Sequence, residues 1–321
     1  MKHGLEEKSS VRERAIRFGK STSLIGVLSE PPAGTERQPV GVVFLNSGIL
    51  HHVGACRIHV RLARKLAAAG FCSIRFDLSG IGDSEARKDS LSFEQSAQLE
   101  VQEALDHLAA SKKLQHFLLV GLCSGADMAF LVSQNDARVV GLCQLDGYAY
   151  RTPGYFLRYY APKVFRLKPW LNLIRRKLGQ ASSTANGKGP EPGADYVRPE
   201  YRRRFPPKET VEAGLRTLTA RGVDLLYLFS AGQGDHYNHR RQYERSFRNV
   251  DFGGRIQVEY YGDADHLFSA LRHQEQVDQV IPQWAARVAQ RNSVDTAEQT
   301  ENVPATLNVR AARAASSANA G

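Results

Sequence analysis

The stretch that decides the fold is Val120-Gly121-Leu122-Cys123-Ser124-Gly125-Ala126. An apolar run at residues 116–120 precedes it, and an apolar-rich helical pattern at residues 127–132 follows it. A strand, a sharp turn and a helix in this order are the context of a nucleophile elbow. The spacing Gly-x-nucleophile-x-Gly puts Cys123 at the nucleophile position, between two glycines that let the strand and helix backbones approach closely.

Ser124 is the other candidate nucleophile, but it fits only if the turn is shifted by one residue. Cys123 precedes the predicted helix, and the positive end of a helix dipole favours a thiolate over the thiol, whose free pKa is about 8.5. Many ordinary strand-to-helix turns match a five-residue pattern of this kind. The hypothesis of catalysis therefore depends on whether the rest of the chain supplies a base and an acid.

The cysteines and the terminal segments limit the class of protein. The four cysteines are Cys56, Cys72, Cys123 and Cys143. They show no CxxC pair and no His/Cys spacing typical of zinc, so we expect no metal and no other cofactor. Cys72 and Cys143 lie in apolar runs and are predicted to be buried thiols. The lack of a disulfide framework, of a signal peptide and of any run of 18 apolar residues indicates a cytoplasmic protein.

The formal net charge of +10 is concentrated in one part of the chain. Residues 151–209 hold 14 Lys and Arg residues but 4 Asp and Glu residues. A basic segment can meet nucleic acid, an anionic membrane or an acidic substrate, or it can be a solvated face. Here the basic residues are interleaved with tyrosines and an apolar stripe, without a nucleic-acid-binding motif, so we expect no nucleic-acid partner.

Strand and helix patterns alternate along most of the chain. A predicted β-hairpin over residues 15–28 comes first, and helical patterns separate the apolar strand runs that follow it, at 40–45, 71–77, 116–120, 139–145, 223–230 and 256–261. Repeated β-α units require right-handed crossovers, which produce a mostly parallel sheet covered by helices. The predicted fold class is therefore α/β, with a doubly wound sheet.

The alternation stops at residue 148 and resumes near residue 214. An interruption of this length is too long for a plain loop, so we interpret residues 148–213 as a cap inserted over the C-terminal edge of the sheet. The core then comprises residues 15–147 and 214–290. Residues 1–14 are predicted to be a flexible N-terminus and residues 291–321 a disordered tail.

Three candidate catalytic side chains follow three predicted parallel strands. Cys123 follows the strand run at 116–120. Asp235 lies in the loop after the run at 223–230, and His266 lies in the loop after the run at 256–261. The C-terminal ends of parallel strands share one sheet edge. A nucleophilic thiol needs a base within reach, and the base needs an orienting carboxylate. The sequence thus predicts Cys123 as nucleophile, His266 as base and Asp235 as acid.

Other carboxylates compete for the role of the acid. Asp146 ends the run at 139–145 and is the alternative to Asp235. Asp263 and Asp265 lie too close to His266 in sequence to be favoured. Asp77 and Asp83 are expected to fix their own glycine-rich turn rather than to bind a ligand.

Over residues 15–290 the chain resembles the α/β-hydrolase superfamily. The resemblance is carried by Gly-Leu-Cys-Ser-Gly at 121–125, Asp-Leu-Ser-Gly-Ile-Gly-Asp-Ser at 77–84 and Asp-Ala-Asp-His at 263–266. The second motif is similar to the family's Asp-x-Arg-Gly-x-Gly-x-Ser, with Ser79 at the usual arginine position. The resemblance implies an eight-stranded sheet, a catalytic triad and an oxyanion hole. The family's usual nucleophile is serine, and cysteine occurs in relatives that resemble dienelactone hydrolase.

More narrowly, residues 75–84 and 121–126 resemble hydrolases linked to bacterial exosortase and exopolysaccharide systems. The predicted reaction is cleavage of an ester or thioester of a small-molecule acyl substrate through an acyl-enzyme. The oxyanion hole would use the backbone N–H of Ser124 and one near Gly48 or Ile49. The alternative is a non-catalytic protein of this fold that binds a ligand or a partner.

The predicted cap suits an amphiphilic or anionic substrate because it combines aromatic and basic residues. Its stretch at 163–178 could also contact a membrane surface, which would place the protein at the periphery of the inner membrane.

Overall fold

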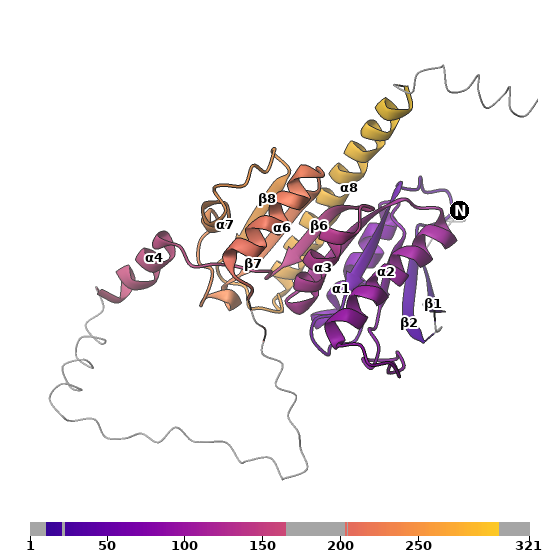
Figure 1. Ribbon diagram of the computed structural model, residues 1–321, viewed down its shortest axis with the longest axis horizontal. Coiled ribbons are helices and arrows are strands. Elements are labelled where there is room, and N and C mark those ends of the chain that lie inside the picture. The colour runs from indigo at the N-terminus through magenta and orange to yellow at the C-terminus, as the bar shows by residue number, and fades with distance from the viewer. Residues whose placement is uncertain (1–10, 21–22, 165–202, 204, 302–321) are drawn as a thin grey trace, which may run out of the picture.

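The computed structural model describes residues 11–20, 23–164, 203 and 205–301. These residues form one eight-stranded sheet with helices on both of its faces (Figure 1). The strands are β1 (Arg12–Phe18), β2 (Leu24–Glu30), β3 (Val40–Leu45), β4 (Ser73–Phe76), β5 (His116–Leu122), β6 (Val139–Leu145), β7 (Asp224–Ser230) and β8 (Ile256–Tyr261).

The strand order is β1-β2-β4-β3-β5-β6-β7-β8. The β1–β2 and β2–β4 pairs are antiparallel, and all the pairs from β4 to β8 are parallel. The expectation of a mostly parallel, doubly wound, eight-stranded sheet is confirmed. Since β5, β6, β7 and β8 are consecutive neighbours and parallel, the loops after their C-terminal ends all emerge at one edge.

Helices cover the sheet in two layers. The helices are α1 (Ile58–Ala68), α2 (Phe93–Lys112), α3 (Ser124–Asn135), α4 (Pro153–Val164), α6 (Lys208–Ala220), α7 (Gln242–Ser246) and α8 (Leu271–Glu301), with short 3-10 turns η1 (Ala55–Arg57) and η2 (Ala231–Gln233). Apolar residues of α2, α3 and α6 belong to one core cluster, and those of α1 and α8 belong to the other. The sheet thus has a separate apolar core on each face.

The central strands supply side chains to both cores in alternation. Leu119 of β5 lies in the cluster under α2 and α3, whereas Leu118 and Val120 lie in the cluster under α1 and α8. All three are buried. This pattern explains the continuous apolar runs in the sequence, because both faces of a covered parallel strand are removed from water.

The two terminal boundaries of the core differ from those predicted. β1 begins at Arg12, inside the segment 1–14 that was predicted to be flexible, because it pairs with β2 from Arg12 onward. The Glu13 carboxylate is also held by Arg64 (2.6 Å to Nη2) and Arg75 (3.1 Å to Nη2). Helix α8 continues to Glu301, inside the predicted disordered tail. Arg291 pairs with Asp224 there, and residues 291–301 contain no glycine or proline to end the helix.

The predicted cap is described only in part. Residues 148–164 form a short lead and helix α4, which in Figure 1 extends away from the sheet. Residues 165–202 and 204 lie outside the described residues, and with them most of the basic stretch at 163–178. Helix α6 begins at Lys208 and buries Val211 and Leu215 in the sheet core, so the core resumes six residues before the predicted position of 214.

No helix in the described ranges combines the length and the apolar character that crossing a membrane requires.

Candidate active site

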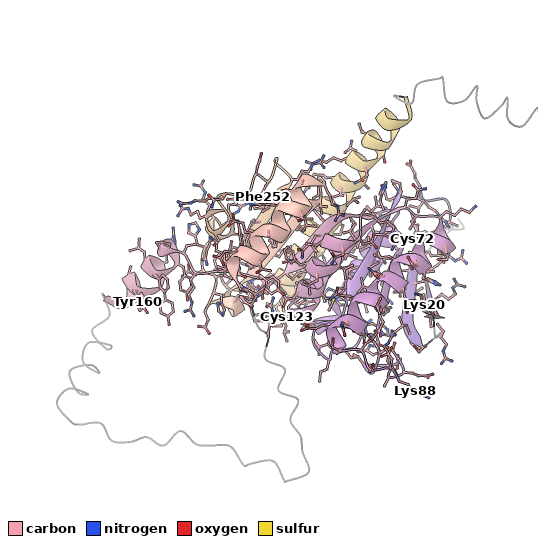
Figure 2. All side chains as sticks on the ribbon, viewed as in Figure 1. Lys20, Cys72, Lys88, Cys123, Tyr160 and Phe252 are labelled. Carbon is pink, nitrogen blue, oxygen red and sulfur yellow. The ribbon has the colours of Figure 1, made fainter. Side chains whose placement is uncertain are left out.

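Cys123 lies in a sharp turn between β5 and α3, and Figure 2 labels it at the lower margin of the core. Its backbone has φ 56° and ψ −119°, a left-handed conformation that costs a non-glycine residue about 1–3 kcal/mol. The Cys123 N–H donates to the Leu145 carbonyl at 2.9 Å, which ties the turn to β6. The strained turn leaves the thiol half-buried at the C-terminal edge of the sheet.

Both flanking glycines are required by close backbone approach. A Cβ added to Gly121 would lie 2.3 Å from the carbonyl carbon of Gly125. A Cβ added to Gly125 would lie 2.5 Å from the Asn46 carbonyl oxygen, in the loop after β3. The geometry thus confirms the prediction that the helix and strand backbones come close at the Gly-x-Cys-x-Gly turn.

The imidazole of His266 is oriented by Asp146. Nδ1 of His266 lies 2.7 Å from Oδ2 of Asp146, and His266 follows β8. Asp146 is fully buried after β6, and Ser230 holds its carboxylate with a backbone N–H (2.7 Å to Oδ1) and a hydroxyl (2.6 Å to Oδ2). These hydrogen bonds fix the position of the Asp146 carboxylate relative to the His266 imidazole. The carboxylate that orients the histidine in a catalytic triad is fixed in the same way.

Asp235, the predicted acid, does not meet His266. The chain turns directly after β7 through η2, so Ser230 faces Asp146 and Gly232 packs on His266, where an added Cβ would lie 2.4 Å from the His266 nitrogen. Asp235 comes after this turn and is exposed. Its carbonyl oxygen accepts from Arg151 (2.7 Å) and Tyr155 (3.1 Å). The carboxylate at His266 is therefore the alternative acid, Asp146.

Hydrogen bonding links the thiol to the imidazole and shifts the pKa of both. Burial raises the pKa of the Cys123 thiol, but the hydrogen bond with His266 and the charge of Arg203 outweigh it, so the pKa is lowered. The hydrogen bond with Asp146, and then that with Cys123, raise the pKa of His266 to about 10. Both shifts favour a thiolate–imidazolium pair.

Ser124, the alternative nucleophile, has a different set of contacts. Its hydroxyl oxygen accepts the backbone N–H of Gly48 at 2.6 Å, and its own backbone N–H is bonded to Cys123. The imidazole of His266 is hydrogen-bonded to the thiol of Cys123, one residue earlier. Of the three residues predicted for the oxyanion hole, Gly48 and Ser124 are therefore hydrogen-bonded to each other, and the Ser124 N–H contacts the Cys123 thiol. Ile49 is 83% exposed, in the same loop.

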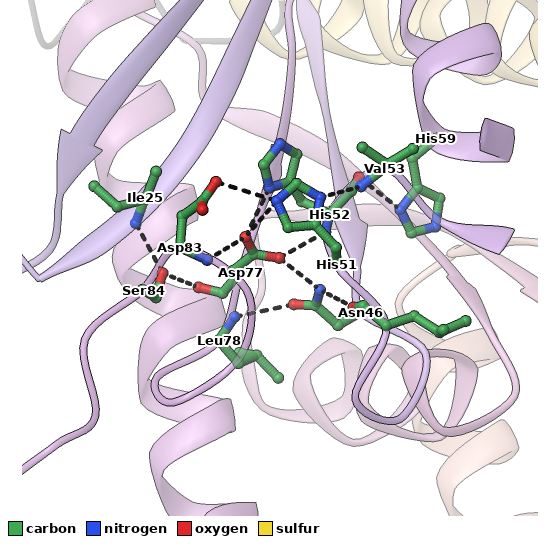
Figure 3. A network of polar contacts seen from close by, with 11 residues as sticks. Ile25, Asn46, His51, His52, Val53, His59, Asp77, Leu78, Asp83 and Ser84 are labelled. Carbon is green, nitrogen blue, oxygen red and sulfur yellow. Dashed lines mark hydrogen bonds and ion pairs between the residues drawn. The ribbon is translucent and has the colours of Figure 1, made fainter.

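A network of polar contacts fixes the loop that carries Gly48 (Figure 3). The Asn46 amide donates to the Leu50 carbonyl (2.7 Å) and to Oδ1 of Asp77 (3.2 Å), and its oxygen accepts the Leu78 N–H (3.0 Å). His52 adds two contacts to Asp77, from its backbone N–H (2.6 Å) and from Nδ1 (2.7 Å). Asp77 thus clamps this loop to the glycine-rich turn at 77–84.

Four side chains of this network have ligand atoms within 4.8 Å of one another and could geometrically hold a metal ion: His51, His52, Asp77 and Asp83. They also satisfy one another. His51 Nε2 lies 3.1 Å from Oδ2 of Asp83, and the Asp83 N–H donates to Asp77 at 3.1 Å. This agrees with the expectation that Asp77 and Asp83 fix their own turn.

Arg203 is a component of the site that sequence reasoning missed. Its guanidinium donates to both carboxylate oxygens of Asp127 and to the carbonyl oxygen of Asp146. In the sequence Arg203 is one of three consecutive arginines, so nothing local distinguishes it. Ser230 was also missed, although its place at the end of β7, beside the end of β6, follows from the strand order.

The structure also has a mostly apolar pocket of 320 Å³. It lies between α3, α6 and the segment after β6, with Phe130, Tyr148 and Phe205 among its lining residues. Phe130 is seven residues beyond Cys123, about 10 Å along a helix axis, so this pocket is separate from the Cys123 thiol.

Solved structures similar to this chain share its fold at low sequence identity. An esterase from Pyrococcus furiosus matches with a TM-score of 0.53 and 12% identity, covering 87% of this chain and 91% of the esterase. Est1E from Butyrivibrio proteoclasticus, solved with ferulic acid bound, matches with a TM-score of 0.53 and 13% identity over 82% of this chain and 94% of Est1E. Proline iminopeptidase from Mycobacterium smegmatis matches with a TM-score of 0.50 and 12% identity over 88% and 100%.

The strand order and these similarities together show that the chain has the α/β-hydrolase fold. No family model matches the sequence, and no curated protein matches it.

Proposed function

We propose that the protein is a hydrolase that cleaves an ester or thioester through a Cys123–His266–Asp146 triad. The observation that carries the proposal is the chain of contacts from Asp146 Oδ2 to His266 Nδ1, at 2.7 Å, and from His266 to the Cys123 thiol at the nucleophile elbow. The four strands whose ends supply Cys123, Asp146, Ser230 and His266 are adjacent, so a rigid sheet sets the distances.

The charges fit acyl transfer with cysteine as the nucleophile. The Cys123 thiolate attacks the carbonyl carbon and a C–S bond to Cys123 forms. The bond between the acyl carbon and the oxygen or sulfur of the leaving group then breaks, and His266 gives its proton to the departing alcohol or thiol. Neutral His266 then takes a proton from water, and the hydroxide attacks the S-acyl carbonyl. The C–S bond breaks, the acid product leaves, and the proton stays on His266 beside the thiolate. Asp146 stabilises the imidazolium in each step in which His266 is protonated.

The developing oxyanion needs donors next to Cys123. The proposed donors are the backbone N–H of Ser124, which already bonds to the Cys123 thiol, and that of Gly48, which bonds to the Ser124 hydroxyl from the loop after β3. The Ser124 hydroxyl accepts the Gly48 N–H in this structure, so a bound acyl oxygen would have to displace that hydroxyl or receive the hydroxyl's own proton. Loss of one such donor costs about 3–4 kcal/mol of transition-state stabilisation in other enzymes.

The proposed substrate is a small acyl compound, and a narrower assignment rests on resemblance. Residues 75–84 and 121–126 resemble hydrolases associated with exosortase and exopolysaccharide systems, which favours a bacterial exopolysaccharide context and a cytoplasmic location.

Helix α4 supports contact with an anionic membrane surface, because Phe156, Leu157 and Tyr160 are exposed beside Arg158. Sedimentation with anionic, but not neutral, vesicles would test the contact, and its absence would contradict it.

The central experiment compares p-nitrophenyl esters and acyl-CoA thioesters with wild type, Cys123→Ala, Cys123→Ser and Ser124→Ala. We expect Cys123→Ala to abolish turnover and Ser124→Ala to retain most of it. The reverse result would move the nucleophile to Ser124. Cys56→Ala is the matched control, because Cys56 is the exposed thiol outside the site.

A labelling experiment separates the enzyme from a non-catalytic protein of this fold. Iodoacetamide should label Cys123 stoichiometrically at neutral pH, and His266→Ala should remove the enhancement. Labelling at the rate of a free thiol, unchanged by His266→Ala, would support the alternative of a ligand- or partner-binding protein.

A further inference from the structure

Arg203 joins the segment before α6 to two elements of the candidate site. Its Nε and Nη2 donate to Asp127 at 2.6 Å and 2.5 Å, in a bidentate pair. Its Nη1 donates to the backbone carbonyl oxygen of Asp146 at 2.9 Å. All three guanidinium nitrogens therefore donate hydrogen bonds, which fixes the orientation of the planar group. Lysine has no such planar fork of donors.

Both partners of Arg203 belong to the proposed machinery. Asp127 lies in the first turn of α3, and its backbone N–H donates to the Cys123 carbonyl at 3.2 Å. Asp146 orients His266. Since Asp146 has φ 49°, its backbone is held in a conformation that non-glycine residues seldom adopt, and a hydrogen bond to its carbonyl helps to hold it there. Arg203 thus connects the nucleophile's helix to the acid's loop.

The surroundings of Arg203 preserve the effect of its charge. Its side chain is 13% exposed, and the Phe205 and Tyr148 ring centroids lie 4.8 Å and 5.7 Å from its central carbon. Aromatic walls exclude water, so a charge in this position is screened less than a charge at the surface. After burial and the His266 hydrogen bond, Arg203 is the next cause of the shift in the Cys123 pKa, which it lowers.

We propose that Arg203 is a positioning residue of this site: it holds the Asp146 loop against α3 and supplies a permanent positive charge that favours the thiolate of Cys123. The proposal rests on the proposed function, because a role for the thiolate requires that Cys123 is the nucleophile. Asp127 occupies two of the three guanidinium nitrogens, and so the contacts favour this internal role over capture of a substrate anion by the Arg203 fork.

The test is the pH dependence of Cys123 alkylation by iodoacetamide in the full chain. The variant Asp127→Asn/Arg203→Gln replaces the ion pair by a neutral pair and leaves no buried charge alone. We expect the pH midpoint of alkylation to rise by about one unit, the lower end of the effect of a nearby opposite charge. Arg203→Lys keeps the charge without the bidentate geometry, so its midpoint should lie between those of the wild type and the double variant.

Asp136→Asn/Arg138→Gln is the matched control. Arg138 also pairs with an aspartate through two nitrogens, at 3.0 Å and 2.7 Å, but it precedes β6 at the opposite edge of the sheet. Its alkylation midpoint should equal that of the wild type. A similar shift in the control would mean that any lost ion pair has this effect, and would overturn the proposal.

Two other outcomes are distinguishable. If wild-type Cys123 is activated and the midpoint is unchanged in the folded Asp127→Asn/Arg203→Gln protein, as judged by circular dichroism, the role of Arg203 is overturned and the proposed function stands. If wild-type Cys123 reacts no faster than a free thiol, the proposed function fails, and the role of Arg203 fails with it.

Discussion

His266 Nδ1 lies 2.7 Å from Oδ2 of Asp146, a residue that follows β6 and precedes β7 in the sheet. This contact favours Asp146 over Asp235 as the acid of the proposed triad. Its direct test is Asp146→Asn against Asp235→Asn. In a serine protease with a Ser-His-Asp triad, replacing the orienting aspartate by asparagine reduces kcat about 10⁴-fold. We expect Asp146→Asn to reduce kcat by about 10³- to 10⁴-fold here.

Asp235→Asn should change kcat/KM by less than about twofold, because the carboxylate is exposed and the contacts made by residue 235 use its backbone oxygen. Both variants should be measured on the same ester and thioester. A large loss in Asp235→Asn with little loss in Asp146→Asn would reverse the assignment.

The fold, and the placement of Cys123 and His266 at one sheet edge of the candidate site, could be predicted from the sequence because they depend on periodicity and local turns. The apolar runs at β3, β5, β6 and β7 record burial on both sheet faces, and the glycines around Cys123 record a close approach of two backbones. Cys123 and His266 each follow their strands closely. Their meeting at one edge therefore follows from parallel strands alone.

The acid could not be chosen from the sequence because two loops each contain a candidate aspartate. Asp146 and Asp235 both follow a strand. Ser230, the last residue of β7, contacts the Asp146 carboxylate, whereas Asp235 lies beyond the three-residue turn η2 and is exposed. Arg203 was hidden for a related reason, since a contact between residues 76 positions apart leaves no local pattern. The terminal boundaries differ from the prediction because long-range contacts carry no local pattern: β1 pairs with β2 from Arg12 onward, Glu13 pairs with Arg64 and Arg75, and Arg291 pairs with Asp224.

The Ser230 hydroxyl, 2.6 Å from Asp146 Oδ2, should matter for both stability and catalysis. Ser230→Ala leaves a fully buried carboxylate oxygen with one donor fewer, which costs about 1–3 kcal/mol in the free energy of unfolding. Its kcat should also fall, since the freed carboxylate holds His266 less firmly. Urea denaturation and ester turnover measure the two effects.

Ser133→Ala is the control for that substitution. Ser133 is also fully buried, and its hydroxyl donates at 2.6 Å to the Ala129 carbonyl within α3, away from the triad. We expect a smaller loss of stability there, because that carbonyl also has its helical partner, and an unchanged kcat. Equal loss of kcat in both serine variants would show that the effect is one of packing.

The elbow glycines should not tolerate even one methyl group. Gly121→Ala would place a Cβ 2.3 Å from the Gly125 backbone, where no side chain can move aside. Relief requires a shift of α3 against β5, which costs about 1–3 kcal/mol or more and displaces Cys123 from His266. Thermal unfolding and iodoacetamide labelling should both report the change.

Gly154→Ala in α4 is the comparison for Gly121→Ala, since the nearest atom to its added Cβ is the end of the flexible Arg158 side chain, 3.2 Å away. Alanine has the higher helix propensity by about 1 kcal/mol, so this variant should be neutral or slightly more stable. A Gly121→Ala protein with wild-type melting temperature and labelling would contradict the tight elbow.

The thiolate–imidazolium pair predicts a bell-shaped dependence of kcat/KM on pH. The acidic limb reports ionisation of Cys123, whose lowered pKa places this limb below the range of a free thiol. The alkaline limb reports loss of the His266 proton, near pH 10, after which the leaving group has no acid. Because the folded pKa of His266 is raised from 6.5, its contribution to stability is complete below pH 6.5 and is lost as the pH rises through 10.

Asp146→Asn removes the largest cause of the raised pKa of His266, so the alkaline limb of this variant should move to lower pH, while the alkaline limb of Asp235→Asn stays in place. An alkaline limb unmoved by Asp146→Asn would show that His266 is not the titrating acid.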